Sequence, residues 1–587
     1  MSNGGRTIRA TALSIAGFLT VAANPARGQT TTAAAEPGAG ADWPTPGGDL
    51  ALTRFSRLDR LTPANVAGLK PLWTFDPGIP GPHEGNPLIV DGTMYVLGPF
   101  PNTVAAVDLT VPGHPVRWRY AVPAAVARLK LPTGWRDAGT RGLAYHPKGV
   151  VLVPLLHGEI AGLDARTGRE IWRVKNTDWR SGGTMPGAPL VVKDLVIVGT
   201  AGAEYGVRGQ MSAYDALTGR LVWRAWHTGP DADVLIDGEA NSNYASHRGI
   251  DLGVSTWTGA EWQHGGATAS GWISYDPGLD LIFYGTDHPG TYNAAQRPGA
   301  NKWGNTIFAR SAATGRVRWA LQLTPHDEWG YDASNESLLV DLTIGGRAVK
   351  ALVHFDRNGF AYTIDRTTGR ILIAERFGPL NWASRIDHPS GEPVLAAKYR
   401  QGTGKTAGIC PAAAGAKGLQ AASWSPRTGL FYVPTTDLCM DLTPKAVTYT
   451  AGQLYAGATI SMSPVPGPSQ GRLVAWDATR GSVAWQVPER YPVTGGTLTT
   501  AGGLVFYGTM DGWLKAVDQT SGLELWRFKT PSGIIGNPVS FADAAGRQYV
   551  AVYSGIGGWI GGTGGPFPDI ASIAPPGGVV TVFGLTP

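Results

Sequence analysis

The chain has 587 residues, a formal charge of +5 and only 16% charged residues, with 82 glycines, 44 prolines and 21 tryptophans. This length is too great for one compact core and leaves room for a large repeat architecture. The glycine and proline content favours a turn-rich all-β protein over a helical bundle, and the small net charge gives no reason to expect nucleic acid or an anionic membrane as a partner.

Residues 1–28 are typical of a secretory signal peptide. Arg6 and Arg9 form a basic start, and residues 12–23 form an apolar run that is too short to span a bilayer. An anchoring helix is the alternative, which the polar Thr/Ala-rich tether over residues 29–42 disfavours. Three of the five net positive charges come from arginines in residues 1–28, so the remaining residues carry a formal charge of +2. We expect a periplasmic protein without a transmembrane segment, folded over residues 43–587.

A sequence repeat runs through this region with a spacing of about 40 to 55 residues. Its unit is a hydrophobic residue, an Asp, a Thr/Ser-Gly turn and a Trp. Copies end at Trp118, Trp172, Trp223, Trp319, Trp485 and Trp526, and a copy without Trp surrounds Gly369. Asp and Gly favour a tight turn, and the Trp ring can cover the edge of a neighbouring blade. Seven copies and a blade shared by both ends predict an eight-bladed β-propeller, although counting alone allows seven blades.

The segment from Gly271 to Glu336 predicts a four-stranded meander with a long inserted loop and an acidic exit loop. Loops held by a rigid sheet are frequent places for chemistry. The loops of this segment contain Asp287, His288, Asp327, Glu328 and Asp332.

The chain has two cysteines, Cys410 and Cys439, which flank a predicted strand pair. In an oxidising compartment we expect them to form a disulfide, whereas two buried thiols are the alternative. No CxxCH motif is present, so we expect no covalently attached c-type haem.

The central segment, with RPGANKW and TPHDEWGYD, resembles the corresponding region of the pyrroloquinoline quinone (PQQ) dependent methanol and ethanol dehydrogenases. In pattern it is most similar to the lanthanide-type methanol dehydrogenases, and the resemblance continues from about Trp43 to the C-terminus. It implies an eight-bladed β-propeller that binds PQQ at its axis together with Ca²⁺ or a lanthanide ion. It also implies oxidation of an alcohol or aldehyde, with soluble cytochrome c as electron acceptor. A homodimer is an open option.

The resemblance also implies roles for individual residues. Glu204 matches a metal-binding Glu, and Asp332 matches an Asp that is an additional metal ligand in the lanthanide type. Carboxylate oxygens suit such hard cations, and the guanidinium fork of Arg suits the carboxylates of PQQ. Contacts with PQQ are implied for Glu84, Arg141, Thr268, Arg357 and Trp559.

The chain departs from the family where chemistry is expected. Gly330 stands at the position of the catalytic Asp, His288 at an Asn metal ligand, and Ser270 at the Trp that stacks under PQQ. Trp135-Arg136 replaces a vicinal cysteine pair, and Gly418 replaces an Asn. His288 can still ligate a metal, with a preference for softer transition ions, or it can be a hydrogen-bonded pocket histidine.

Two hypotheses follow. In the first, the protein is a dehydrogenase with a rebuilt site, in which Glu204, Asp332 and His288 hold the metal, and Asp332, Asp287 or His288 replaces the missing base. In the second, it is a non-catalytic propeller that binds, senses or acts as a scaffold. A third reading, an outer-membrane assembly propeller, shares the repeat but lacks the HDEW and RPGxNKW segments.

Two expectations concern the small residues. Gly330 and Ser270 both reduce side-chain volume, which predicts a substrate bulkier than methanol. Gly330→Asp is expected to create activity if only the base is missing.

Overall fold

The computed structural model describes residues 1, 38–129, 131, 139–238, 243–558 and 566–586, and its regular structure is mostly β-strand. The predicted signal peptide, most of the tether, Trp135, Arg136 and Trp559 lie outside the described residues. The compact unit spans Pro37–Pro587, and Ala39 already belongs to it, because its backbone N–H donates to the Phe55 carbonyl at 2.7 Å. No helix in the described part of the chain is long and apolar enough to cross a membrane.

In the described residues, eight sheets have four or five strands. The first four are β3 (Leu88–Val90), β4 (Thr93–Leu97), β5 (Val104–Asp108) and β6 (Val116–Tyr120); β7 (Ala144–His146), β8 (Val150–Leu155), β9 (Glu159–Asp164) and β10 (Glu170–Lys175); β11 (Leu190–Val192), β12 (Leu195–Gly199), β13 (Gln210–Asp215) and β14 (Leu221–Trp226); and β15 (Ile273–Asp276), β16 (Leu281–Gly285), β17 (Thr306–Ser311) and β18 (Val317–Gln322).

The next two sheets are β19 (Ser337–Ile344), β20 (Arg347–Phe355), β21 (Phe360–Asp365) and β22 (Arg370–Arg376); and β26 (Ser423–Trp424), β27 (Phe431–Pro434), β30 (Gly471–Asp477) and β31 (Ser482–Glu489). The seventh has β32 (Thr497–Thr500), β33 (Leu504–Gly508), β34 (Trp513–Asp518) and β35 (Glu524–Lys529), with β1 (Phe55–Ser56) added in parallel to β32. The eighth joins the two ends of the chain, because β2 (Leu69–Phe75) pairs with β38 (Val579–Leu585), followed by β37 (Gln548–Ser554) and β36 (Val539–Ala542).

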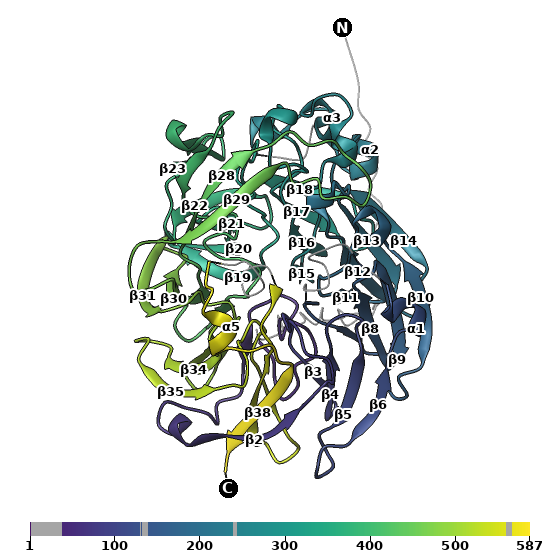
Figure 1. Ribbon diagram of the computed structural model, residues 1–587, viewed down its shortest axis with the longest axis vertical. Coiled ribbons are helices and arrows are strands. Elements are labelled where there is room, and N and C mark those ends of the chain that lie inside the picture. Colours follow the sequence, from purple (N-terminus) through teal and green to yellow (C-terminus); the bar gives the residue numbers. More distant parts are fainter. Residues whose placement is uncertain (2–37, 130, 132–138, 239–242, 559–565, 587) are drawn as a thin grey trace. The chain divides into compact units, whose positions relative to one another are not determined.

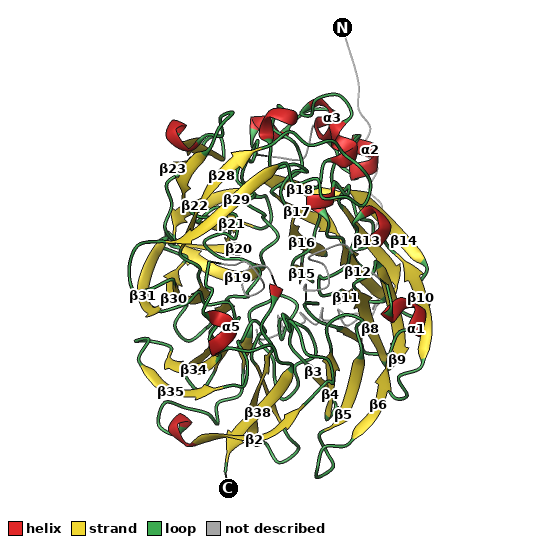
Figure 2. Cartoon of the chain, in the orientation of Figure 1, coloured by secondary structure: helices red, strands yellow, loops and turns green. Residues whose placement is uncertain are grey.

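The remaining elements are small and decorate these sheets. Two small sheets contain β23 (Ala383–Asp387) with β24 (Glu392–Leu395), and β25 (Thr406–Ile409) with β28 (Leu438–Pro444) and β29 (Ala458–Pro464). The α-helices are single turns, α1 (Ala124–Ala127), α2 (Asp231–Val234), α3 (Leu252–Ser255) and α5 (Ile570–Ile573) (Figure 2). The 3-10 turns are η1 (Val66–Gly68), η2 (Trp179–Ser181), η3 (Ala203–Tyr205), η4 (Ala245–His247), η5 (Glu261–His264), η6 (Ala294–Gln296) and η7 (Ala397–Tyr399).

The eight larger sheets of the described chain follow one another around a common centre (Figure 1). Each sheet shares a buried hydrophobic cluster with the next one. A further cluster joins the β32–β35 sheet, the sheet made by both chain ends and the β3–β6 sheet. The predicted all-β class and the sheet shared by both termini are therefore confirmed.

The repeat explains how neighbouring sheets dock. The indole N–H groups of four tryptophans donate to carbonyls of the following copy at 2.9 to 3.1 Å. Their acceptors lie three residues before a glycine, and a Cβ on that glycine would lie 2.5 to 2.7 Å from the indole. The pairs are Trp118 with Gly168, Trp172 with Gly219, Trp223 with Gly315, and Trp319 with Gly369. The Trp of one copy and the Gly of the next copy thus pack directly against each other, which confirms the predicted role of the Trp in docking neighbouring sheets.

We expect Trp223→Ala to lower the free energy of unfolding by about 3–5 kcal/mol, because it removes a buried ring and its hydrogen bond to Ala312. Trp485 is the matched control, since it is only partly buried and its indole nitrogen has no partner among the described residues. Trp485→Ala should cost less. Guanidinium denaturation measures both, and an equal or smaller loss in Trp223→Ala would contradict a stabilising contribution from its deeper burial and its hydrogen bond.

The predicted disulfide is present between Cys410 and Cys439. Cys439 lies in β28, and Cys410 directly follows β25, which pairs with β28. The bond therefore links Cys410, the residue after β25 and four residues before Ala414 in the chain, to the neighbouring strand β28.

A buried histidine makes stability depend on pH. His227 Nδ1 donates to the Ala267 carbonyl at 2.7 Å, and Nε2 lies 3.1 Å from the Tyr284 hydroxyl. Burial, helped by Arg310, lowers the pKa of His227 to about 3. In the unfolded chain this histidine has an ordinary pKa of about 6.5. As the pH falls below that value, the unfolded chain binds a proton at this position and the folded protein does not.

Stability is therefore expected to fall as the pH drops from about 6.5 towards about 3. Melting curves of the wild type and His227→Gln between neutral and acid pH test this, because the variant should show a flatter dependence. Identical pH slopes in the two proteins would contradict it.

Candidate functional site

A cavity of about 130 Å³ is lined by charged, amide and apolar groups from several sheets. Its polar side chains are Glu84, Arg141, Arg357, Gln420 and Thr494, and its other lining residues are Ala414, Gly418, Leu419, Ile535, Gly557 and Gly558. Arg141 is fixed by a 3.0 Å ion pair with Glu84 and by a 2.9 Å hydrogen bond to the Ser270 carbonyl. Three of the predicted cofactor-binding residues, Glu84, Arg141 and Arg357, therefore line one cavity.

Several hydrogen-bond donors of this cavity have no protein acceptor. Nε of Arg141, Nε of Arg357 and Nε2 of Gln420 are buried without a partner in the described part of the chain. Buried donors are normally satisfied, so this wall suits a ligand that presents several acceptor oxygens. An anionic quinone such as PQQ has this chemistry, and the residues present fit it.

Gln420 is a site residue that the sequence analysis missed. Its Oε1 accepts the Gly418 N–H at 3.1 Å, which leaves Nε2 free. A Cβ at Gly418 would lie 2.9 Å from that Oε1. Gln420 therefore brings a side-chain amide next to Gly418 in the cavity wall, and its position two residues after Gly418 was the available sequence signal.

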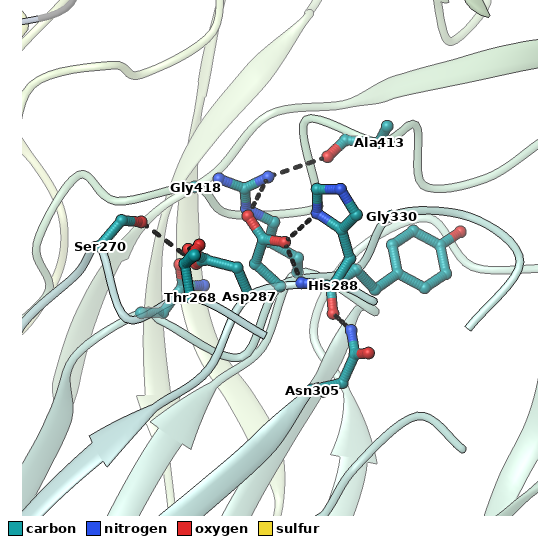
Figure 3. A network of polar contacts seen from close by, with 12 residues as sticks. Thr268, Ser270, Asp287, His288, Asn305, Gly330, Ala413 and Gly418 are labelled. Carbon is teal, nitrogen blue, oxygen red and sulfur yellow. Dashed lines mark hydrogen bonds and ion pairs between the residues drawn. The ribbon is translucent and has the colours of Figure 1, made fainter. Parts of the chain in front are cut away.

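Beside the cavity, Asp332 joins His288 and Arg357 into one buried cluster (Figure 3). The backbone N–H and Nδ1 of His288 each lie 2.8 Å from Oδ1 of Asp332. Nη1 of Arg357 lies 2.9 Å from Oδ2 of the same carboxylate. His288 follows β16, and Asp332 lies between β18 and β19, so the central meander brings them together as its loops predicted.

The charges in this cluster fix its protonation. Burial alone would raise the pKa of Asp332, but Arg357 and His288 lower it to about 2. Burial would lower the pKa of His288, but the Asp332 carboxylate raises it above its ordinary value. Asp332 is thus an ionised carboxylate at neutral pH, held by two cationic or donating partners.

A second carboxyl group, that of Asp287, lies beside this cluster. Asp287 accepts hydrogen bonds from the hydroxyls of Thr268 at 2.5 Å and Ser270 at 3.1 Å (Figure 3). Burial and the nearby Asp332 raise the pKa of Asp287 to about 7. Thr268, a predicted cofactor contact, is absent from the cavity lining described above, and its hydroxyl donates to Asp287. The link between Ser270 and Asp287 had no recognised sequence signal.

The space beside Gly330 is filled. Gly330 has a φ of +80°, and a Cβ there would lie 2.2 Å from Cε1 of Tyr292. The Tyr292 ring stacks on the His288 ring with centroids 4.5 Å apart. The volume left by the missing side chain is therefore occupied by Tyr292, and the expectation of a bulkier substrate on the ground of Gly330 is wrong.

Glu204 lies in η3, and the backbone of residues 455–456 bonds both to it and to Tyr292. The Glu204 carbonyl accepts from the Tyr455 N–H at 2.6 Å, and the Ala456 carbonyl accepts from the Tyr292 N–H at 2.7 Å. No hydrogen bond or ion pair holds the Glu204 carboxylate within the described residues. No group of three or more His, Cys, Asp or Glu side chains is placed there to hold a metal. The predicted ligands Glu204, His288 and Asp332 therefore do not form a complete metal site by themselves.

Comparison with known proteins gives the same picture over the whole folded chain. Residues 43–378 and 398–550 match the family model of the PQQ glucose/ethanol/alcohol dehydrogenase β-propeller domain. The lanthanide-dependent methanol dehydrogenase of Methylacidiphilum fumariolicum (strain SolV) is 47% identical over 531 residues, which cover 90% of this chain and 86% of that protein.

Two further relatives agree. Subunit 1 of the cytochrome c methanol dehydrogenase of Methylobacterium organophilum is 42% identical over 575 residues, covering 93% of this chain and 91% of that protein. The solved structure of a europium-containing methanol dehydrogenase matches with a TM-score of 0.89 and 44% identity, covering 94% of this chain and 99% of that one. With this match over nearly all its folded residues, the chain belongs to the PQQ family of alcohol dehydrogenase β-propellers.

Proposed function

We propose that this protein is a periplasmic PQQ-dependent dehydrogenase that oxidises an alcohol or aldehyde and passes the electrons to a cytochrome c-type acceptor. The observation that carries this proposal is the cavity in which Arg141, Arg357 and Gln420 keep unpartnered donors. When bound there, PQQ would supply the hydride acceptor. The names of the relatives, which include cytochrome c and methanol, support the acceptor and the substrate class.

The protein groups around this cavity have separate tasks. Arg141 and Arg357 would neutralise and orient the anionic cofactor, and Gln420 would add an amide donor. Glu84 fixes the guanidinium of Arg141 through their ion pair. These contacts would hold the reacting atoms in place, which is the contribution that a protein makes to cofactor chemistry.

Asp332 is our proposed proton acceptor, in place of the carboxylate missing at Gly330. An ionised carboxylate offers about four acceptor positions. The three contacts from His288 and Arg357 use two at Oδ1 and one at Oδ2. One position at Oδ2 is left for the hydroxyl proton of an alcohol, next to the guanidinium that lines the cavity.

We also propose that the eight sheets close into an eight-bladed propeller. The buried clusters shared by successive sheets support this, as does the Trp526 indole, which donates to the Leu69 carbonyl at 3.0 Å at the start of β2. The basic and apolar features of residues 1–28 support export to the periplasm. We also keep a homodimer as a proposal.

Activity should depend on added PQQ and on Arg141. We expect Arg141→Gln to raise the PQQ concentration for half-maximal dye-linked alcohol oxidation at least about tenfold, because the variant loses the positive charge and the unpartnered Nε donor of Arg141. Arg117→Gln is the control, since Arg117 forms an ion pair with Asp108 away from the cavity. If wild-type protein binds PQQ and oxidises no alcohol or aldehyde, a binding, sensing or scaffold protein is the better description.

A further inference from the structure

We propose that Glu336 and Lys417 are positioning residues, whose buried ion pair orients the side-chain amide of Gln420 toward the bound cofactor. This inference rests on the proposed function in taking PQQ as the occupant of the cavity. It adds two residues that are absent from the cavity lining and that act on the ligand through a third residue, which belongs to the lining.

The Glu336 carboxylate holds both ends of one segment of the cavity wall. Three lining residues of the cavity lie in residues 417–422, namely Gly418, Leu419 and Gln420. At the start of this segment, Nζ of Lys417 donates to Oε2 of Glu336 at 2.8 Å. At its end, the Ala422 N–H donates to Oε1 of the same carboxylate at 2.6 Å. One carboxylate therefore fixes the distance that the wall segment spans.

This ion pair is fully buried, with 0% of the Lys417 side chain and 1% of the Glu336 side chain exposed. Nζ of Lys417 makes a second hydrogen bond, to the Gly418 carbonyl at 3.1 Å. Separating two buried charges leaves each of them without compensation, which is strongly unfavourable. Conformations of the wall segment that would break the pair are therefore disfavoured.

Gly418 connects the ion pair to Gln420. Its carbonyl accepts from Nζ of Lys417, and its N–H donates to Oε1 of Gln420 at 3.1 Å. Because Oε1 is the acceptor in this contact, Nε2 is the free donor of the amide, and it is buried without a partner in the described part of the chain. Buried donors are normally satisfied, so a ligand with acceptor oxygens in the cavity is the natural partner of Nε2.

The missing side chain at position 418 allows this contact. A Cβ on Gly418 would lie 2.9 Å from Oε1 of Gln420. Leu419, between these two residues, is held separately, because its carbonyl accepts from Nε1 of Trp272 at 2.9 Å. The orientation of the Gln420 amide therefore depends on Gly418, and the position of Gly418 depends on the ion pair.

A second buried ion pair provides the matched control. Nζ of Lys515 lies 2.7 Å from Oε1 of Glu489, and their side chains are 11% and 10% exposed. The other contacts of this pair are with Tyr507 and Glu524, and none of the four residues lines the cavity. This pair shows what the loss of a buried ion pair does when the cavity wall does not depend on it.

Titration of PQQ into the purified full-length protein, with Ca²⁺ or La³⁺ in excess, measures the effect without turnover through the quenching of tryptophan fluorescence. We expect Glu336→Gln and Gln420→Ala each to raise the Kd for PQQ at least about fivefold, because each variant misorients or removes a donor to an anionic ligand. Glu489→Gln should leave this Kd unchanged. An unchanged Kd in Glu336→Gln, or an equal rise in Glu489→Gln, would overturn the proposal.

The double variant Glu336→Gln/Gln420→Ala shows whether the two residues act together. If Glu336 acts through Gln420, the double variant binds PQQ no more weakly than Gln420→Ala alone. If the two losses multiply, Glu336 does not act through Gln420 and the proposal is wrong.

Gly418→Ala tests the same connection with the ion pair intact, since the new Cβ meets only the end of a flexible side chain within 3 Å. It should weaken PQQ binding at least about threefold and lower the melting temperature less than Glu336→Gln does. In the Gln420→Ala background it should cause no further loss, whereas a methyl group that merely blocks the cavity would. Wild-type protein that binds PQQ and oxidises no alcohol or aldehyde would refute only the proposed function, and normal PQQ binding by these variants would refute only this inference.

Discussion

Asp332→Asn is expected to lower the rate of alcohol oxidation by about 10²–10⁴-fold, because a positioned general base typically contributes that factor. The amide keeps the shape of the side chain but cannot accept the substrate proton. It also loses the charge that pairs with Arg357 at 2.9 Å. Steady-state kinetics with a primary alcohol, at saturating PQQ and metal, measures the effect in kcat.

Loss of a buried ion pair also destabilises a protein, so the kinetic effect needs a matched control. Asp276 forms a 2.7 Å ion pair with Arg366, and both are as buried as the Asp332 pair. Asp276→Asn should reduce stability to a similar extent and leave kcat unchanged, because this pair lies outside the cavity lining. A near-normal kcat in Asp332→Asn would remove Asp332 from the mechanism and point to Asp287.

Gly330→Asp is expected to destabilise the protein by about 2–4 kcal/mol and to create no activity. The new Cβ would lie 2.2 Å from Cε1 of Tyr292, and the backbone has a φ of +80°. Displacing the Tyr292 ring would also disturb His288, on which it stacks. The sequence alone predicts that this substitution creates activity if only the base is missing, so the two expectations differ in outcome.

The double variant Gly330→Asp/Tyr292→Ala separates the two causes, since it removes the collision and keeps the backbone strain. It should recover part of the lost stability in denaturant unfolding. Gly346→Asp measures the backbone cost alone, because Gly346 has a φ of +77° and no atom within 4 Å of its ideal Cβ. A Gly330→Asp protein as stable as Gly346→Asp would show that Tyr292 yields at no cost.

The fold was predictable because its determinants repeat along the sequence. The contact between Trp223 and Gly315 joins two copies of one motif. Trp223 is recognisable in the sequence because it supplies a large ring, and Gly315 because its backbone has a positive φ. The disulfide was predictable from two cysteines and the predicted export signal. The blade count was less accessible, because the chain ends share a sheet and one copy lacks its Trp.

The site was predictable only in part. Residue identities at Glu204, His288 and Asp332 indicated polar chemistry, and the loops of one meander brought two of them together. The side chains that lie next to Gly330 and Gly418 were not predictable, because no sequence motif marks those contacts. Tyr292 reaches Gly330 across 38 positions of chain, and the amide of Gln420 folds back onto Gly418. Such contacts depend on three-dimensional packing that no local pattern records.

The most direct test of the proposed function is the anaerobic absorbance spectrum of the PQQ-loaded protein before and after a primary alcohol is added. We predict that the spectrum of the bound quinone changes to that of its reduced form in the wild type and stays oxidised in Asp332→Asn. If the bound quinone stays oxidised in the wild type with every alcohol and aldehyde tried, the protein is not a dehydrogenase of these substrates, and its PQQ cavity serves binding alone.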